Sequence, residues 1–293
     1  MARSTIVTHN GGFHADDVFA VATLLLHLKN QDITVVRTRD KDVIEKGDFV
    51  VDVGGVYDPK TNRFDHHQIG GAGERDSGIP YAAFGLVWKH FGEELSGGEE
   101  TMLALDALLA TPLDAIDNGI DLVSPLVGKV FPYEISDAVR AFLPTWEEKV
   151  SVDERFNQAV DFARTLLSRE IVRVSAKRKG EQFTVSAYHA SGDKRLVVLD
   201  VDYPWKEVLA RFPEPIFVVH PEEGGWRLYC VRDNPKQFMN RKDLPEEWAG
   251  LRDEALAKVS GVSDAVFCHR NRFMAVARSR AGAVALAQRA LEN

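Results

Sequence analysis

The sequence predicts an α/β protein, and two patterns among its 293 residues indicate this class. Short apolar runs rich in β-branched residues, at 6–7, 33–36 and 49–51, predict buried strands. Between the first two, apolar residues recur at helical spacing over 15–28 and predict a helix. We therefore expect neighbouring parallel strands, at whose carboxyl ends an open α/β sheet binds its ligands.

The remaining elements follow in chain order. In the first half, helical spacing predicts helices at 81–91 and 101–116, a helical segment at 131–146 bounded by two prolines, and a long amphipathic helix at 152–171. In the second half we expect strands at 183–187, 196–199, 216–219 and 228–231, a hairpin of 265–269 and 273–277, and helices at 203–211, 245–259 and 281–291.

The composition is that of a globular protein, with 45% hydrophobic and 27% charged residues. The longest apolar run, 19–26, is far too short to cross a bilayer, and the N-terminus has neither a signal-peptide nor a transit-peptide pattern. Cys230 and Cys268 lack the spacing of metal ligands. We therefore expect free thiols and a cytoplasmic location, without membrane association.

Charge is distributed unevenly along the chain. The net charge of −8 argues against unselective nucleic-acid binding, which needs a positive face. Residues 1–168 carry 15 Lys and Arg against 27 Asp and Glu, whereas residues 169–293 carry 21 against 17. An acidic half that holds cations, next to a mildly basic half, would suit a phosphate-bearing substrate. A chance distribution of surface charge explains the counts equally well.

Two short motifs, THNGGFHADD at 8–17 and RFDHHQ at 63–68, contain four of the nine histidines. With the VVDVGG segment at 50–55 they supply His9, His14, Asp16, Asp17, Asp52, Asp65, His66 and His67. Imidazole nitrogens and carboxylate oxygens suit Mn, Fe, Co, Ni and Zn, and an open His/Asp site is usually catalytic. A lone Asp after a strand is more often a turn residue, and a lone His more often structural. Two dense clusters at predicted strand ends favour a metal site.

A third acidic segment, DAIDNG at 114–119, ends the helix predicted at 101–116. Asp114 and Asp117 are three positions apart, so they share a face if the helix persists that far. The Asn-Gly pair that follows is a strong stop signal. Arg37 and Arg39, after the second strand, either bind phosphate or pair with local acids, and the sequence leaves both alternatives open.

These motifs together resemble the DHH phosphoesterase superfamily. The order H-x4-H-x-D-D, VVDVGG, DHH and DAIDNG is most similar to the Myg-type (melanocyte-proliferating-gene) family of metal-dependent hydrolases, which are regarded as 3′-to-5′ RNA exonucleases. The resemblance covers nearly the whole chain and continues through LPEEWAGLRDEAL and VSGVSDAVFCH in the second half. It implies a parallel-sheet DHH-type catalytic domain at 1–150, a helical linker at 151–180 and a smaller, mixed α/β substrate-binding domain at 181–293.

The resemblance also implies two divalent metal ions, Mn²⁺ in the first place, with Mg²⁺, Co²⁺ or Zn²⁺ as alternatives. One ion is expected on His9, His14 and Asp52, and the other on Asp16, Asp52, His66 and Asp117. Asp52 would bridge them, because a carboxylate can serve two cations with its two oxygens. His67 would donate a proton or hydrogen bond to phosphate. Asp17 and Asp65 would orient the histidines, and Asp114 is the alternate for Asp117.

The segment expected to hold the substrate phosphate departs from the family pattern. The family usually carries Gly-Gly-His before a final Arg-x-Arg, where this chain has Ala275-Val276-Ala277. Side chains at these positions occupy space where a ligand would approach. The other substrate-binding candidates remain: Arg37, Arg39, His269, Arg278 and Arg280.

The function predicted from these observations is that of a metal-dependent hydrolase, a 3′-to-5′ exonuclease of RNA or short oligonucleotides. One alternative is a phosphoesterase acting on a dinucleotide or pyrophosphate. Another is a non-enzymatic, metal-bearing RNA-binding or regulatory protein. Exposed aromatic residues would favour oligonucleotides, with Trp205, Trp226, Trp248 and Phe273 as candidates unless they belong to the core. A homo-oligomer is left open.

Overall fold

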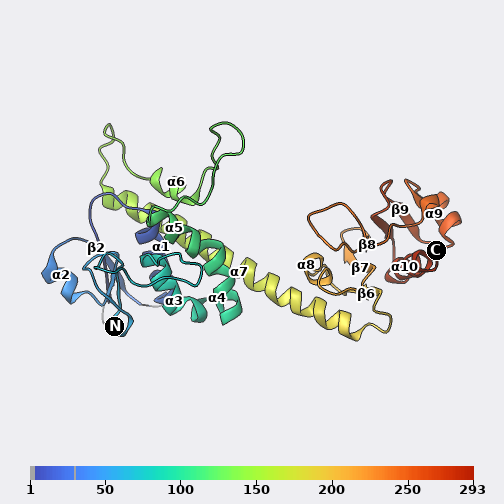
Figure 1. Ribbon diagram of the computed structural model, residues 1–293, viewed down its shortest axis with the longest axis horizontal. Helices are drawn as coiled ribbons and strands as arrows, with labels where there is room; N and C mark the ends of the chain where they lie inside the picture. Colours follow the sequence, from blue (N-terminus) through green and yellow to red (C-terminus); the bar gives the residue numbers. More distant parts are fainter. Residues whose placement is uncertain (1–3, 30) are drawn as a thin grey trace. The chain divides into compact units, whose positions relative to one another are not determined.

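The computed structural model describes residues 4–29 and 31–293, which form two compact units, 1–175 and 176–293 (Figure 1). Each unit contains one five-stranded sheet with helices packed against it. The two mixed sheets confirm the predicted α/β class. The functional division into a catalytic domain, a linker and a substrate-binding domain stays a prediction.

The first sheet has the strand order β2-β1-β3-β5-β4. Its strands are β1 (Ser4–Thr8), β2 (Ile33–Arg37), β3 (Phe49–Val51), β4 (Tyr57–Asp58) and β5 (Arg63–Phe64). Four of them are parallel, with Ile6 opposite Val35 and Phe49, and only β4 runs antiparallel, beside β5. Because β2 and β3 lie on opposite sides of β1, the strand order reverses at the carboxyl end of β1, where open α/β sheets bind ligands.

Alternating side chains bury both faces of this sheet. Ile6 and Val51 belong to the main core, which also includes residues of α1 (Ala15–His27) and α3 (Ala83–Ser96). Val7 and Val50 point to the opposite face, where α2 (Lys41–Lys46) lies against β1. The sheet is thereby fixed from two sides, and so are the loops that leave its carboxyl ends.

Helices complete the first unit. The segment predicted as one helix at 101–116 consists of α4 (Glu99–Leu105), a π-helical turn (Asp106–Ala110) and α5 (Thr111–Asp117). The helix predicted at 131–146 is wrong in extent, because only α6 (Ile135–Arg140) forms within it. The flanking prolines restrict the residues before them to extended conformations.

Helix α7 (Val152–Ala190) is 39 residues long, so the strand predicted at 183–187 is wrong. Thr184 and Val185 are β-branched, which suggested a strand, but the buried positions here are Glu181, Thr184 and Tyr188, at helical spacing. The Thr184 hydroxyl donates to the Pro204 carbonyl at 3.2 Å. Tertiary contacts therefore override the local preference.

The second unit is built on a sheet of order β6-β7-β8-β10-β9. Its elements are β6 (Leu196–Val198), α8 (Lys206–Leu209), β7 (Phe217–Glu222), β8 (Gly225–Cys230), α9 (Asp253–Ser260), β9 (Ala265–Cys268), β10 (Met274–Ala277) and α10 (Arg280–Glu292). The predicted hairpin of β9 and β10 is confirmed. Within the helix predicted at 245–259, Gly250 has a φ of 74° and separates a short 3₁₀ turn from α9.

Both cysteines are free, as predicted, and the structure shows that both are buried. Burial raises the pKa of the Cys230 thiol to about 12 and that of Cys268 to about 11, so both are neutral at pH 7. None of the helices in the described part of the chain is long and apolar enough to cross a membrane.

Candidate metal centre

Three adjacent parallel strands each deliver a candidate ligand from the loop at their carboxyl end. His9 follows β1, Asp52 follows β3 and His66 follows β5. The distance from His9 Nε2 to Asp52 Oδ2 is 3.3 Å, and that from His66 Nε2 to Asp52 Oδ1 is 3.4 Å. The predicted convergence of these three residues is therefore present in the structure.

Asp52 occupies the centre of the site in a constrained conformation. Its φ of 55° lies in the left-handed region, which Asp tolerates better than most residues other than glycine. The backbone N–H of Asp52 donates to the Phe64 carbonyl at 3.1 Å, and the residue is only 5% exposed. Residues held in such conformations concentrate at functional sites.

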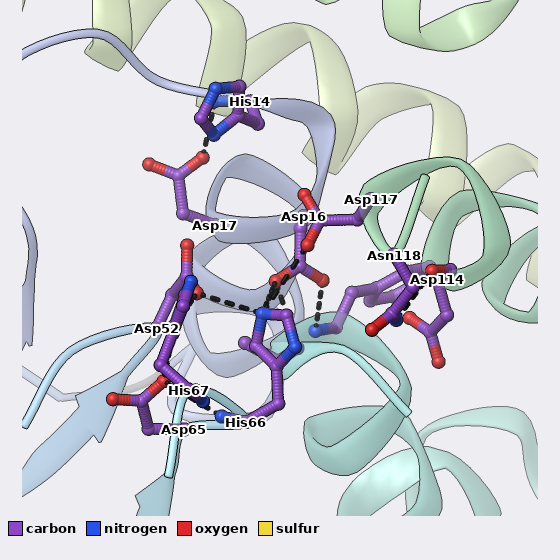
Figure 2. Close-up of polar contacts among 12 residues, drawn as sticks. His14, Asp16, Asp17, Asp52, Asp65, His66, His67, Asp114, Asp117 and Asn118 are labelled. Atoms are coloured by element: carbon purple, nitrogen blue, oxygen red, sulfur yellow. Dashed lines mark hydrogen bonds and ion pairs between the residues drawn. The ribbon is translucent and has the colours of Figure 1, made fainter. Parts of the chain in front are cut away.

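Among the described residues, three groups of side chains are close enough to hold a metal ion. They are His9, Asp17 and Asp52; Asp16, His66 and Asp117; and Asp52, His66 and His67. We call these seven residues the His/Asp cluster. Asp52 and His66 each belong to two groups, and Figure 2 shows the His66 ring facing Asp52, Asp16 and Asp117. Adjacent ions that share a ligand would fit this arrangement.

Asp16 and Asp17 lie in the first turn of α1, and their carboxylates accept hydrogen bonds from different partners. Both oxygens of Asp16 accept from backbone N–H groups at the start of α3, Ala83 at 2.9 Å and Phe84 at 2.7 Å. Asp17 Oδ1 accepts from the His14 N–H at 2.8 Å, while its Oδ2 lies 3.4 Å from His9 Nε2. These bonds fix both carboxylates before any ligand binds.

Opposite charges determine the protonation of the centre of the cluster. Burial opposes ionisation of Asp52, but His66 and His9 lower its pKa to about 2. Burial lowers the pKa of His9 and of His66, yet the adjacent Asp52 outweighs this, so both pKa values are raised. Burial raises the pKa of Asp17 to about 7. Without a cation, the cluster therefore retains protons near neutral pH.

The two outer carboxyls have raised pKa values for the same reason. Burial is the largest cause for Asp16 and for Asp117, and the charge of Asp52 adds to it. Asp117 Oδ2 lies 3.3 Å from His66 Nε2, at the end of α5. Bringing these acids together is unfavourable unless protons or cations neutralise them.

Several buried polar atoms of the cluster have no hydrogen-bond partner among the described residues. They include Asp17 Oδ2, Asp52 Oδ1 and His66 Nε2. A buried polar atom without a partner is costly, and in native structures it usually points to an ion or water. With two imidazoles and four carboxylates in its first two groups and no thiolate, the cluster suits a divalent transition-metal ion. The residues therefore fit the predicted metals.

The remaining predicted residues from the two His-rich motifs lie at the edge of the cluster. His14 is exposed and in none of the three groups, but its ring centroid lies 6.1 Å from that of His9. His67 is exposed as well, and its Nδ1 lies 2.8 Å from Asp65 Oδ1 and 3.4 Å from Asp52 Oδ1. Asp65 also accepts from the backbone N–H of His66. Asp65 thus orients the DHH segment.

Asp114 belongs to none of the three metal groups and instead forms an ion pair that the sequence did not reveal. Arg75 Nη1 donates to Asp114 Oδ2 at 2.7 Å, and the same guanidinium binds Asp106. Asp114 Oδ1 accepts from the Gly85 N–H, and the residue is fully buried. Burial raises its pKa to about 7. Of the two predicted aspartates, Asp117 faces His66 and Asp114 anchors the 70–78 loop through Arg75.

The cluster opens into a cleft of about 640 Å³, lined mainly by residues from the loops after β1, β3 and β5 and from α5 and α6. Two cations line it, Arg39 and Arg140, and Arg39 donates to the Asn10 carbonyl. Arg140 and Ser136 were not predicted from the sequence, although their i,i+4 spacing in α6 places them on one face. Arg37 does not line the cleft: it donates to Asp153 of α7 at 2.7 Å and lies over the Phe156 ring, so it pairs with an acid that is distant in the sequence.

The three other predicted substrate residues lie in the second unit. His269 Nδ1 accepts from the Asn271 N–H, and its ring lies 4.4 Å from that of Phe273. Arg278 and Arg280 are exposed at the end of β10 and the start of α10. Residues 275–277, in place of the family glycines, are buried in β10. Their roles in substrate binding stay predictions.

Comparisons with known proteins cover almost the whole chain. Residues 5–291 match the family model MYG1_exonuc, described as "Uncharacterised protein family (UPF0160)". The chain is 32% identical to the MYG1 exonuclease of Homo sapiens, over 99% of this chain and 86% of that protein. It is also 32% identical to the MYG1 protein of Dictyostelium discoideum, over 100% and 98%, and 31% identical to a MYG1 protein of Chlamydia pneumoniae, over 94% and 92%.

Proposed function

The chain belongs to the MYG1 exonuclease family, and from this premise we propose that it is a divalent-metal-dependent exonuclease acting on nucleic acid. The observation that carries the proposal is the His/Asp cluster, in which Asp52 is common to two groups of candidate ligands inside one cleft. The names of the relatives indicate the class of reaction. The cluster supplies ligands for the divalent ions that such a hydrolysis would use.

The proposed ligands follow from the cluster and its edge. One ion would be held by His9, His14 and Asp52, with Asp17 orienting His9; the other by Asp16, Asp52, His66 and Asp117. Bound there, two divalent ions supply activation of water and neutralisation of charge on a phosphodiester. The exposed His14 lines the same cleft, which supports its assignment over the fully buried Asp17.

The chain's own side chains would position the substrate. Arg39 and Arg140 line the cleft, and guanidinium groups suit phosphate oxygens because they present paired donors. His67 lines it as well, with Nδ1 held by Asp65 at 2.8 Å. This leaves its other nitrogen available to donate a hydrogen bond or proton to a phosphate or leaving oxygen.

The finer parts of the proposal rest on the sequence. They are 3′-to-5′ polarity, RNA as substrate, Mn²⁺ as the native metal, membership of the DHH superfamily and a cytoplasmic location. The mildly basic composition of residues 169–293 supports an anionic substrate.

A phosphoesterase of small substrates is the second candidate. The cleft volume of about 640 Å³ falls within the roughly 300–1,000 Å³ of pockets for small ligands, so a dinucleotide would fit. A non-enzymatic RNA-binding role would require the cluster to bind metal without turnover.

One experiment separates these functions. Metal-free protein is supplied in turn with Mn²⁺, Mg²⁺, Co²⁺ and Zn²⁺ and offered 5′-labelled RNA, DNA of the same sequence, a dinucleotide and pyrophosphate. A ladder of shortening 5′-labelled RNA is the expected result, and its loss in Asp52→Asn ties it to the cluster. Hydrolysis of small substrates alone would establish the second candidate. No turnover with any metal would refute both enzymatic readings.

His14 and Asp17 can be assigned separately. Titration of Mn²⁺ into His14→Ala and Asp17→Asn compares their metal affinities directly. If Asp17→Asn weakens binding more than His14→Ala, then Asp17 is the ligand and the proposed assignment of His14 is wrong.

A further inference from the structure

The second unit contains a pocket of its own, and the proposed function assigns no role to the residues that line it. Its volume is about 210 Å³, and it is bordered by the start of α8, the end of β8 and the segment 232–238. Its aromatic and cationic lining residues are Trp205, Lys206, Tyr229, Arg232, Phe238 and Phe273. Among the described residues that line it there is no carboxylate, in contrast to the cleft of the first unit.

The inner rings of this pocket are held rigidly. Tyr229 stacks on the buried His220 with an interplanar angle of 5° and a centroid distance of 5.5 Å. Trp205 lies 5.7 Å from Tyr229 on one side, and Phe273 lies 6.4 Å from it at an angle of 25°. Because these rings are already ordered, a planar ligand stacking on them would cost little conformational entropy.

The outer wall combines an exposed ring with a fixed cation. Phe238 is 90% exposed, which is unusual for so large an apolar side chain next to a pocket. The Arg232 guanidinium lies 5.2 Å from the Phe238 ring centre and 5.8 Å from that of Phe273. Its Nε donates to Asn240 and its Nη1 to the Gln237 carbonyl, so the guanidinium is held between two rings.

We propose that this pocket binds one nucleobase of a single-stranded nucleic acid by stacking. The inference rests on the proposed function in that nucleic acid is the substrate. Bases stack on exposed aromatic rings whatever their identity, and cations beside the rings attract the flanking phosphates. The volume is below that of typical pockets for drug-sized ligands, which suits a single ring system. Arg232 and Lys206 give the pocket the charge that a polyanion needs.

The test compares a strand with bases and a strand without them. The full-length protein is kept in EDTA, and fluorescence anisotropy measures binding of a labelled short oligoadenylate and of an abasic strand of equal length. Phe238→Ala is expected to weaken oligoadenylate binding by about 5- to 150-fold, the range for loss of one stacked base, and to leave abasic binding unchanged. Because Phe238 is exposed, its truncation should leave the stability of the fold nearly unchanged.

Met239→Ala is the matched control, because Met239 is the next residue, is 75% exposed and does not line the pocket. It should bind both strands as the wild type does. Equal losses of Phe238→Ala on both strands, or no loss, would overturn the base pocket.

Turnover is measured separately, with Mn²⁺ and labelled RNA. A protein that binds oligoadenylate through Phe238 and hydrolyses no nucleic acid refutes the exonuclease but supports the pocket. If the wild-type protein degrades RNA and Phe238→Ala binds oligoadenylate as the wild type does, the base pocket is refuted and the exonuclease is not.

Discussion

Asp52→Asn is the substitution that most directly tests the His/Asp cluster. Asn has nearly the same shape as Asp and tolerates the left-handed φ of 55°, so the backbone should be retained. What the substitution removes is the negative charge within 3.4 Å of His9, His66 and His67. The variant therefore separates the charge of Asp52 from its geometry.

The size of the effect follows from the pKa of Asp52, which is lowered from 3.8 to about 2. At about 1.4 kcal/mol per pKa unit, the environment favours the ionised form by about 2 kcal/mol. The residue is 5% exposed, so solvent screening is small. A lowered carboxyl pKa contributes stability above the unfolded value of 3.8 and loses it as the pH falls through about 2. We expect metal-free Asp52→Asn to lose about 2 kcal/mol at pH 7 and less towards pH 2.

Urea unfolding without Mn²⁺ measures the loss of stability in Asp52→Asn. Urea unfolding with Mn²⁺ measures how much stability metal binding adds. Wild-type protein should gain stability with the metal, by about 2.7 kcal/mol at 100 times the dissociation constant. Asp52→Asn should lose most of this gain together with turnover. Asp106→Asn is the control, because Asp106 binds Arg75 and Thr111 outside the three metal groups. It should keep the metal-induced gain. Full Mn²⁺-dependent turnover in Asp52→Asn would refute the central role of this residue.

Four further predictions test neighbouring features. Gly85→Ala would place a Cβ 1.8 Å from Asp114 Oδ2, the atom that pairs with Arg75. Because the clash would break this buried ion pair, we expect a loss of about 3–5 kcal/mol in the free energy of unfolding, measured from urea midpoints. An unchanged midpoint would contradict the buried ion pair. His67→Gln should reduce kcat about 10²–10⁴-fold but weaken Mn²⁺ binding far less than His66→Gln, as titration calorimetry would show. Because the pKa values of His9 and His66 are raised, metal must displace protons from them, so Mn²⁺ affinity should rise between pH 5 and 8; calorimetry in buffers of different ionisation enthalpy should detect proton release, and a flat profile would argue against these ligands. With its pKa raised to about 12, the Cys230 thiol should resist iodoacetamide at pH 8 until urea unfolds the protein, and rapid labelling of native protein would contradict its burial.

The sequence was sufficient to predict that β1 and β3 converge at the site. His9 and Asp52 each follow a short apolar run, and parallel pairing forces such positions together at one sheet edge. The contribution of β5 was less visible, because Arg63–Phe64 is too short to show a periodic pattern. His66 was therefore placed from its motif rather than from a predicted strand.

Side-chain partners beyond the local segment were not predictable in the same way. Asp117 was preferred over Asp114 as a ligand, but nothing in the local sequence predicted the ion pair of Asp114 with Arg75, which lies 39 residues earlier. Arg140 enters the cleft from α6, which forms only a part of the predicted helix. In each case the deciding contact is long-range, and local propensity carries no information about it.

Electrostatics of the cleft explains why metal and substrate belong to one proposal. Asp16, Asp17, Asp52 and Asp117 gather where a phosphodiester would have to enter, and residues 1–168 have an excess of 12 acidic over basic residues. Without cations, the protons that the cluster retains near neutral pH neutralise part of this charge, but the cluster then offers a phosphodiester no metal ion to bind. Two divalent ions would displace these protons and add four positive charges at the cluster. Metal should therefore be required for binding of the scissile phosphate as well as for hydrolysis. If the protein binds and hydrolyses RNA in EDTA as well as it does with added Mn²⁺, the proposed metal dependence is wrong.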